Sequence, residues 1–345
     1  MPAMPGWLLL CLAAGAGAMY GDVRAQARME TRWRASELVE SVSAAADGAL
    51  YEPDVLTVPS MDWPALPDIL QPSRFKRGDE RARARNSVAA FVQVCHSIMA
   101  QHGNLRLVDA CAGDGDLLLP IVAVLGCKGL GVDIEQEAVT ALQQRAAQAG
   151  VDVATAQHDA ADLEALLHDG DVVIGLRACG SVADLAVRAA IERRVPFVLS
   201  PCCLWKALQQ APAEGGNGRL PAAMGSARPT DLWYPRSEWL QSRLAPGDFA
   251  LLAAADDSIA LRSSAMLGDG SRSLLWRQAQ RIIEHDRVAV ADESGFETRV
   301  LRFPGGDNAH TAIFVGVPTE CAWAIDALRS LETTPRVDEA PLFSC

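Results

Sequence analysis

The chain has 345 residues, half of them hydrophobic and 21% charged, so it can bury a sizeable core and is not disordered throughout. Its 43 acidic and 31 basic residues give a formal net charge of −12. This charge argues against binding to nucleic acid mainly through bulk charge, although it leaves room for a local basic groove. Nine cysteines, an odd number with no Cys-x-x-Cys pair, argue against a disulfide scaffold or a zinc ribbon and favour a reducing compartment.

Residues 1–45 look like a leader rather than a part of the fold. Residues 1–20 carry no charged side chain, and several arginines follow them. A signal peptide, an organelle transit peptide and an over-extended gene start each fit this pattern, so we expect the segment to be either a targeting signal or disordered. The apolar run is too short and too rich in glycine and alanine for a membrane span. We therefore expect a cytoplasmic or organellar protein whose mature form does not contact a membrane.

The remainder of the chain divides into three stretches. Residues 46–104 are expected to form a helical N-terminal extension that includes a basic arm. Residues 105–317 form the main domain, which is interrupted at 209–230 by a loop insertion rich in Pro, Gly and Ala. Residues 318–345 are expected to form a C-terminal helix and a tail that is disordered from Thr333 onward.

Short apolar runs alternate with helical patterns in the main domain. Such alternation predicts parallel strands joined by crossover helices, and the nearly continuous apolar character of the runs predicts that both faces of the sheet are covered. A closing antiparallel hairpin completes the pattern. The predicted fold is α/β, a Rossmann-like doubly wound sheet of seven strands with a helical N-terminal extension. The strands are expected over residues 105–109, 130–133, 151–156, 171–176, 195–199, 299–303 and 311–317.

The turn after the first of these strands carries the most information. Gly113 and Gly115 allow a tight bend and a close approach of the backbone to a ligand, and the helix that follows directs its amide end at that ligand. A dinucleotide fingerprint would have a third glycine where Leu118 stands. The strand itself ends in Asp109, which could orient the cationic end of an amino acid.

Two further acids follow the second and third strands. Asp133 could accept hydrogen bonds from ribose hydroxyls, and Asp159 could meet an adenine amino group. A single Asp at a strand end is more often a helix cap or a turn former. Three such acids at successive strand ends, beside the glycine turn, favour a ligand with an adenine, a ribose and a positively charged amino acid end. S-adenosylmethionine fits this description better than NAD, whose diphosphate would prefer fewer acids nearby.

Over residues 75–317 the sequence resembles a class I S-adenosylmethionine-dependent methyltransferase. The run Leu176–Asp184 is similar to an HACG-x-x-TD segment of one subfamily, and the run Ser200–Cys203 is similar to a PCCY segment of the same subfamily. This subfamily includes the methyltransferase-like domain of the glutathione S-transferase C-terminal domain-containing protein and related predicted RNA methyltransferases. The run Asp286–Phe296 is similar to a DR…E-x-GY stretch of such domains. The resemblance implies that S-adenosylmethionine is bound by Asp109, Cys111, Ala112, Gly113, Gly115, Asp133, Ile134, Asp159, Ala160 and Arg177.

The sequence also departs from that subfamily at two positions. Arg177 stands where the subfamily usually has His, and Leu204 replaces the aromatic residue after the Cys pair. Cofactor binding survives these changes, but they put catalytic competence and target choice in doubt. The resemblance implies RNA as the acceptor. The alternatives are a methyltransferase that acts on protein or a small molecule, and a methyltransferase-like binding module without activity.

Cysteines are expected to gather where an acceptor would bind. Cys111, Cys179 and the pair Cys202 and Cys203 follow strands that should be neighbours, so they should cluster at the carboxyl edge of the sheet. They could be small packing residues, which we favour, a nucleophile of the kind used by cytosine-C5 methyltransferases, or zinc ligands. We take Cys202 and Cys203 as the catalytic candidates. No Asn-Pro-Pro-aromatic motif is present, which disfavours methylation of an adenine amino group or a glutamine amide.

Two features outside the strand ends bear on RNA. Aromatic residues at 233, 234 and 239 could stack on a base, although such residues more often fix a helix to a core. A basic arm precedes a helix expected over 87–100, and it could contact phosphates or be a solvated helix end. RNA contact through this arm would use Arg74, Lys76, Arg77, Arg81, Arg83 and Arg85.

Overall fold

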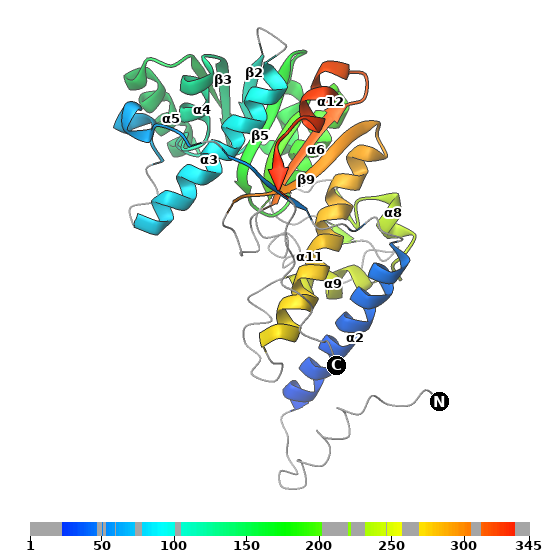
Figure 1. Cartoon of the computed structure of the whole chain (residues 1–345). Coiled ribbons are helices and arrows are strands. Elements are labelled where there is room, and N and C mark those ends of the chain that lie inside the picture. Colours follow the sequence, from blue (N-terminus) through cyan, green and yellow to red (C-terminus); the bar gives the residue numbers. More distant parts are fainter. Residues whose placement is uncertain are drawn as a thin grey trace.

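The computed structural model places one large sheet at the centre of the protein (Figure 1). The structure describes residues 23–46, 50, 53–58, 60–72, 78–100, 105–201, 220–221, 232–245, 247–256, 269–304 and 312–334. Within these residues the strands of the large sheet are β1 Asp54–Leu56, β2 Arg106–Asp109, β3 Lys128–Asp133, β4 Val153–Gln157, β5 Asp171–Ala178, β6 Phe197–Pro201, β9 Phe296–Arg302, β10 Ala312–Pro318 and β11 Thr333–Thr334. A separate two-stranded sheet pairs β7 Leu220–Pro221 with β8 Trp233–Tyr234.

Helices and 3-10 turns connect the strands. The helices of the described residues are α2 Val23–Ala45, α3 Gly78–Met99, α4 Leu118–Leu125, α5 Gln136–Ala149, α6 Val182–Arg193, α8 Glu238–Gln241, α9 Asp248–Asp256, α11 Asp269–Asp292 and α12 Ala322–Arg329. The 3-10 helices are η1 Trp63–Ala65, η2 Asp68–Leu70 and η3 Ala160–Leu166. Among the described residues, no helix is both long and apolar enough to cross a membrane.

The strand order confirms the predicted doubly wound fold. The sheet runs β11-β1-β9-β10-β6-β5-β2-β3-β4. Strands β4, β3, β2, β5 and β6 are parallel, and β10 lies antiparallel between β6 and β9. The carboxyl ends of β2, β3, β5 and β6 therefore meet at one edge of the sheet, which is where a doubly wound fold binds its ligands.

Two short strands extend the sheet beyond the seven that the sequence predicts. β1 pairs with β9 in parallel, and β11 pairs with β1 antiparallel. The sequence pattern missed them because three and two residues are too few to show a period. Leu56 of β1 is nevertheless buried in the main core. Thr333 and Thr334 therefore belong to the fold, in contrast to the expected disordered tail, and the residues after them lie outside the described part.

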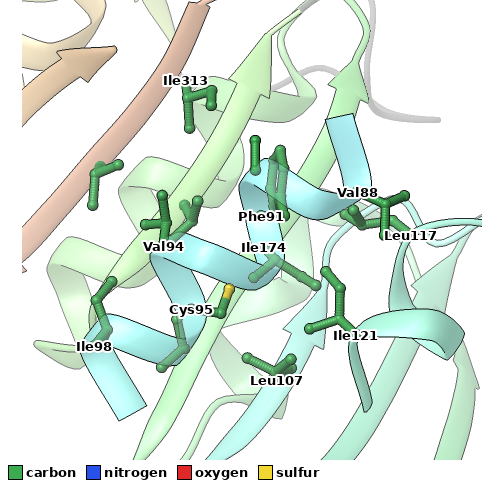
Figure 2. Close-up of a cluster of buried hydrophobic side chains, with 14 of the residues drawn as sticks. Val88, Phe91, Val94, Cys95, Ile98, Leu107, Leu117, Ile121, Ile174 and Ile313 are labelled. Carbon is green, nitrogen blue, oxygen red and sulfur yellow. The ribbon is translucent and has the colours of Figure 1, made fainter. Parts of the chain in front are cut away.

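Both faces of the sheet are covered, as the apolar strands predict. In β5, Val172 and Ile174 face one core cluster and Val173 faces the other, and all three are fully buried. Figure 2 shows the first cluster, where a row of apolar side chains of α3 packs against the strands. This row has helical spacing and consists of Val88, Phe91, Val94, Cys95 and Ile98.

A third cluster lies in a group of helices built from α2, α8, α9 and the middle of α11. Ala35, Val39 and Val42 of α2 are buried there, against residues of α9 and α11. Their spacing of four and three residues places them on one face of the helix. The second half of the segment that sequence analysis set aside as a leader is thus folded, because this apolar stripe has helices to pack on. Residues 1–22 lie outside the described part, so the targeting hypothesis stays a prediction.

Two buried ion pairs join this helical group to the sheet through α11. Arg287 forms a two-pronged contact with Asp184 of α6, with N–O distances of 2.9 and 3.0 Å, and both side chains are almost fully buried. Arg302, at the end of β9, contacts Glu284 of α11 at 2.6 Å. Because β9 is parallel to β6, its end lies at the same edge as the ligand-binding strand ends. The helical group is therefore held beside that edge.

The aromatic residues at 233, 234 and 239 behave mostly as the packing hypothesis predicts. The Tyr234 ring is fully buried and stacks on Phe249 at 5.5 Å, while its hydroxyl donates to Asp184 at 2.5 Å. Trp239 packs edge-on against His285 of α11, and the centres of the two rings are 4.4 Å apart. Trp233 is 38% exposed. The first two residues fix the helical group to α6 and α11, whereas Trp233 remains available at the surface.

The buried ion pair gives a test of this arrangement. Arg287→Leu should lower the free energy of unfolding by about 3–5 kcal/mol, because it leaves the Asp184 carboxylate buried without its partner. The control is Arg329→Leu, which breaks a two-pronged pair with Glu297 on the surface that is even shorter, at 2.7 and 2.6 Å. Chemical denaturation should show little change for the control. Equal losses for the two variants would contradict a joining role for the buried pair.

Candidate cofactor site

The turn after β2 lies directly against the end of β3. The Gly113 amide donates to Oδ2 of Asp133 at 2.8 Å, and the Ala112 amide donates to the Val132 carbonyl at 2.9 Å. Gly113 and Gly115 both have left-handed backbone, with φ of 54° and 91°. The two glycines and the second acid that sequence analysis selected are therefore brought together in one loop.

Asp133 also holds its own strand end. Its Oδ1 accepts the Glu135 amide at 3.0 Å while Oδ2 accepts Gly113. Each carboxylate oxygen has a second lone pair, so the side chain can bind further donors without losing these two. Ile134 follows it and is 42% exposed, which leaves an apolar side chain beside the loop. The sequence predicted a ligand role for both residues, but it did not predict that Asp133 shapes the glycine loop.

Asp109 lies behind the loop, almost fully buried at the end of β2. Its carboxylate accepts the Cys111 amide at 3.2 Å. Burial, together with the nearby charge of Asp133, raises the pKa of Asp109 to about 7. A cationic group placed next to this carboxyl would favour its ionised form and lower its pKa.

The third acid, Asp159, lies close to the second but has a structural task. The His158 amide donates to the Asp133 carbonyl at 3.1 Å, so the end of β4 adjoins the end of β3. Asp159 then caps η3, its side chain accepting the Ala161 amide at 2.9 Å. Ala160 follows and is buried. The capping role that is common for Asp at a strand end is therefore present at this position.

The end of β5 forms another side of this edge. The pairing of β5 with β6 is irregular between Leu176 and Ala178, and Arg177 has a left-handed φ of 59° and an exposed side chain. Cys179 is also exposed, and Cys111 lies beside β5, since a Cβ added at Gly175 would be 3.6 Å from its sulfur. The bulge thus directs residues after β5 outward at the carboxyl edge.

The expected cysteine cluster is described only in part. Cys202 and Cys203 lie outside the described residues, so their catalytic role stays a prediction. Within the described ranges, no group of three or more His, Cys, Asp or Glu side chains could hold a metal ion. Burial raises the pKa of Cys95 far above its usual value and that of Cys127 to about 11. Cys95 lies in the first core cluster and Cys127 packs against it, so both thiols have packing roles.

The described residues of the basic arm differ in exposure. Arg81 and Arg83 are exposed on α3. Arg85 is half-buried, donates to the Gln71 side chain and places its guanidinium 5.4 Å from the centre of the Trp63 ring. Arg74, Lys76 and Arg77 lie outside the described residues. One of the arginines assigned to RNA contact thus has a structural role, which an alternation of Arg and Ala in the sequence could not reveal.

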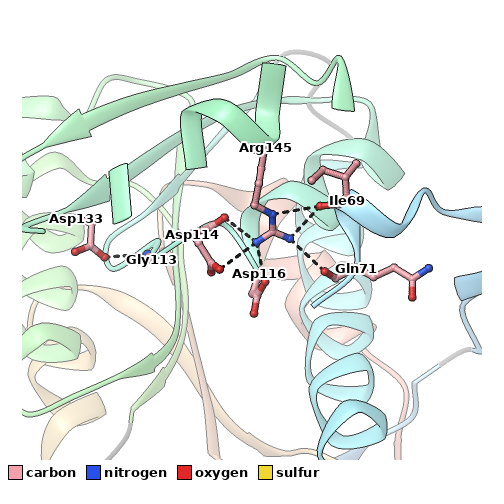
Figure 3. A network of polar contacts seen from close by, with 7 residues as sticks. All are labelled: Ile69, Gln71, Gly113, Asp114, Asp116, Asp133 and Arg145. Carbon is pink, nitrogen blue, oxygen red and sulfur yellow. Dashed lines mark hydrogen bonds and ion pairs between the residues drawn. The ribbon is translucent and has the colours of Figure 1, made fainter. Parts of the chain in front are cut away.

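One residue that contacts the glycine loop, Arg145 of α5, is not revealed by the motifs of the sequence. Figure 3 shows its guanidinium between Asp114 and Asp116 of the glycine loop and the backbone of Ile69 and Gln71. Its side chain is only 12% exposed. The available signal was a charged residue beside the apolar stripe of α5, between Leu142 and Ala146, although many such residues are simply solvated.

Comparisons with known proteins agree with the motifs. A family model described as a methyltransferase domain matches residues 83–210, which include β2 to β6. The glutathione S-transferase C-terminal domain-containing protein of Bos taurus is 21% identical over 271 residues, and that of Homo sapiens is 22% identical over 273 residues. Each match covers 78% of this chain but only 39% and 38% of the relative, so the chain spans about two fifths of their length. These matches confirm the resemblance to this methyltransferase subfamily.

Two solved methyltransferase structures match parts of this chain. The magnesium protoporphyrin IX methyltransferase of Synechocystis with bound SAM is 14% identical, with a TM-score of 0.37, and the match covers 70% of this chain and 82% of that one. The 16S rRNA N2 G1207 methyltransferase of T. Thermophilus is 20% identical, with a TM-score of 0.27, over 32% of this chain and 33% of that one.

Gly115→Ala tests the packing behind the glycine loop. A Cβ at Gly115 would lie 2.4 Å from Cδ1 of Leu142 and would demand a left-handed φ of 91°. We expect a loss of about 3 kcal/mol or more in the free energy of unfolding, from overpacking and backbone strain together. The control is Gly126→Ala, which has a similar left-handed φ of 63° but open space around the new methyl group. If both variants lose the same amount, packing behind the loop is not the constraint.

The raised pKa of Asp109 predicts a pH dependence of stability. The folded-state pKa of about 7 lies above the ordinary value of 3.8, so the folded protein binds the proton more tightly than the unfolded chain. The contribution of Asp109 to stability should therefore fall as the pH rises from about 4 to about 7, and level off above. Asp109→Asn cannot ionise at this position. Relative to this variant, the free energy of unfolding of the unchanged protein, measured by denaturation, should fall as the pH rises across this range. Parallel curves would contradict the shift.

Proposed function

We propose that the protein is an S-adenosylmethionine-dependent methyltransferase whose cofactor site is the loop between β2 and α4 together with the end of β3. The observation that carries the proposal is the contact of the Gly113 amide with Asp133. It places a glycine turn and a carboxylate with free lone pairs side by side at the ligand-binding edge of a sheet with the appropriate strand order. The matching methyltransferase domain spans the same residues.

The donor set of the site fits this cofactor. Asp109 suits the ammonium group of the methionine part, and Asp133 suits the two ribose hydroxyls. Ile134 offers an apolar surface for the adenine ring, beside Asp159 and Ala160 at its amino group. The diphosphate of a nicotinamide dinucleotide would be repelled by the same carboxylates.

Methyl transfer needs little covalent chemistry from the protein. The cofactor, when bound, supplies a methyl group that is activated by its sulfonium centre. The residues of the chain bind and orient it, exclude water and place an acceptor opposite the methyl group. The acceptor side falls at the ends of β5 and β6, next to Cys179 and before the Cys202–Cys203 pair. We favour a packing role for these cysteines over a nucleophilic one.

RNA is the acceptor class that we propose. Its support is the subfamily resemblance together with Arg81 and Arg83, which are exposed on α3 of an otherwise acidic protein. Arg74, Lys76 and Arg77 would extend this basic surface along the chain. A protein acceptor, a small-molecule acceptor and a binding module without activity are the alternatives. Arg177 in place of the usual His and Leu204 in place of the usual aromatic residue motivate the last of them.

Calorimetry tests the cofactor proposal. S-adenosylmethionine should bind the full chain and NAD should not, and Asp133→Ala should weaken binding by the loss of buried hydrogen bonds, each worth on the order of 1–3 kcal/mol. Asp133 also accepts the Gly113 and Glu135 amides, so Asp133→Asn, which keeps the shape of the side chain and one acceptor oxygen for them, should weaken binding less than Asp133→Ala. Binding of NAD without binding of S-adenosylmethionine would contradict the proposal and favour a dehydrogenase.

A transfer assay tests the acceptor. Radiolabelled S-adenosylmethionine should transfer its methyl group to a component of total RNA and not to total protein. Charge reversal of Arg81 and Arg83 together should then reduce transfer and leave cofactor affinity unchanged. Label in protein alone would overturn RNA as the acceptor, and cofactor binding without transfer to either fraction would support the inactive binding module. If transfer survives Cys202→Ser and Cys203→Ser, neither cysteine is a nucleophile.

A further inference from the structure

Arg145 joins two segments that are far apart in the sequence. Its Nη1 donates to the Asp114 carbonyl and to Oδ1 of Asp116, both at 2.8 Å, on the glycine loop. Its Nη2 donates to the carbonyls of Ile69 and Gln71 at 3.0 and 3.2 Å, and its Nε also points to Ile69, at 3.3 Å. A single planar guanidinium thus holds the loop on one side and the end of η2 on the other.

Apolar packing supports the same junction. Leu70 of η2 shares a buried cluster with Ala112 of the glycine loop and with Leu119, Leu142 and Ala146. Leu70 is 3% exposed and Ala112 is 6% exposed. Residues around η2 therefore pack directly on the loop, and the polar contacts of Arg145 define how the two pieces are oriented.

The η2 segment is itself internally braced. The Gln71 side chain donates to the carbonyls of Trp63 and Leu66, both at 3.1 Å, and its oxygen accepts from Arg85 of α3. Residues 63–71 therefore form a compact piece rather than a loose linker. A displacement of this piece would be transmitted to the glycine loop through the guanidinium of Arg145.

Charge gives Arg145 a second effect on the loop. Asp114 and Asp116 are 24% and 17% exposed and lie within 3.5 and 2.8 Å of its Nη1. Arg stays protonated at all accessible pH values, so its single positive charge offsets part of the negative charge of the two carboxylates beside the loop. Without it, these carboxylates would repel the carboxylate at the amino acid end of S-adenosylmethionine.

We propose that Arg145 is a positioning residue of the cofactor site, and that through it residues 60–72 form a wall of that site whose order is coupled to cofactor binding. This inference rests on the proposed function. It names a residue and a segment that lie outside the motifs of the sequence, and it assigns them to cofactor affinity rather than to stability alone.

The first test compares two partly buried arginines, Arg145 and Arg106, whose side chains are 12% and 26% exposed. Arg145→Gln should weaken binding of S-adenosylmethionine and S-adenosylhomocysteine in calorimetry by about tenfold or more, as expected when one charge-assisted contact no longer organises the site. The matched control is Arg106→Gln, which removes a two-pronged pair with Asp171 and a bond to the Leu166 carbonyl at the opposite edge of the sheet. The control should lose stability without losing affinity.

Conservative variants separate charge from geometry. Arg145→Lys restores the positive charge but cannot reach both segments at once, so its affinity should stay well below that of the unchanged protein. Asp116→Asn removes one carboxylate and keeps the shape, and it should weaken binding less than Arg145→Gln. Should Arg145→Gln fail to fold, these two milder variants carry the test. Full affinity in Arg145→Lys would overturn the positioning role.

Hydrogen exchange gives a readout that a purely structural role would not change. In the unchanged protein, S-adenosylhomocysteine should slow exchange of backbone amides in residues 60–72 as well as in 109–116. In Arg145→Gln, at a ligand concentration that saturates the site, protection should remain at 109–116 and be lost at 60–72. Protection of 109–116 alone in the unchanged protein would overturn the inference while leaving the proposed function intact. No binding by the unchanged protein would overturn both.

Discussion

The close contact between the turn after β2 and the end of β3 is the constraint on which the site depends. The Gly113 amide can reach Asp133 at 2.8 Å only because the two strands are neighbours and because glycines line the path. At Gly131 a Cβ would lie 2.1 Å from Leu142 of α5, so the helix, the strand and the loop pack without room for a further methyl group. The shape of the ligand-binding edge is thereby set by backbone and packing, before any ligand is bound.

A second constraint acts where the helical group meets the sheet. Glu284 and Arg287 lie on the face of α11 that contacts Arg302 and Asp184, while Ile282 and Ile283 belong to the cluster shared with α2 and α9. The helix thus contributes paired polar residues together with Val288 and Ala291 to the sheet side, and Ile282 and Ile283 to its own group. Buried ion pairs tolerate few alternative geometries, which suits a group of helices that is held beside the carboxyl edge of the sheet.

The sequence was sufficient to predict the seven longer strands of the sheet and the residues that follow them, because long apolar runs and glycine turns have strong local signals. It could not show that Asp133 shapes the loop, that Asp159 serves as a cap, or that Arg145 bridges to η2, since each depends on a partner 20 or more residues away or on a competing local bond. The strand β1 and the apolar stripe of α2 were missed for a related reason. Three residues, or one side of an Ala- and Arg-rich helix, become interpretable only once their packing partners are known.

A crystal structure with S-adenosylhomocysteine tests the central claim most directly. The account predicts that the ribose hydroxyls contact the Asp133 carboxylate, that the amino acid end lies over Gly113 and near Asp109, and that the adenine ring lies against Ile134. It also predicts that the Arg145 contacts to Ile69 and Gln71 persist in the complex. Density for the ligand at another part of the molecule, or a bound ribose that does not approach Asp133, would contradict the account.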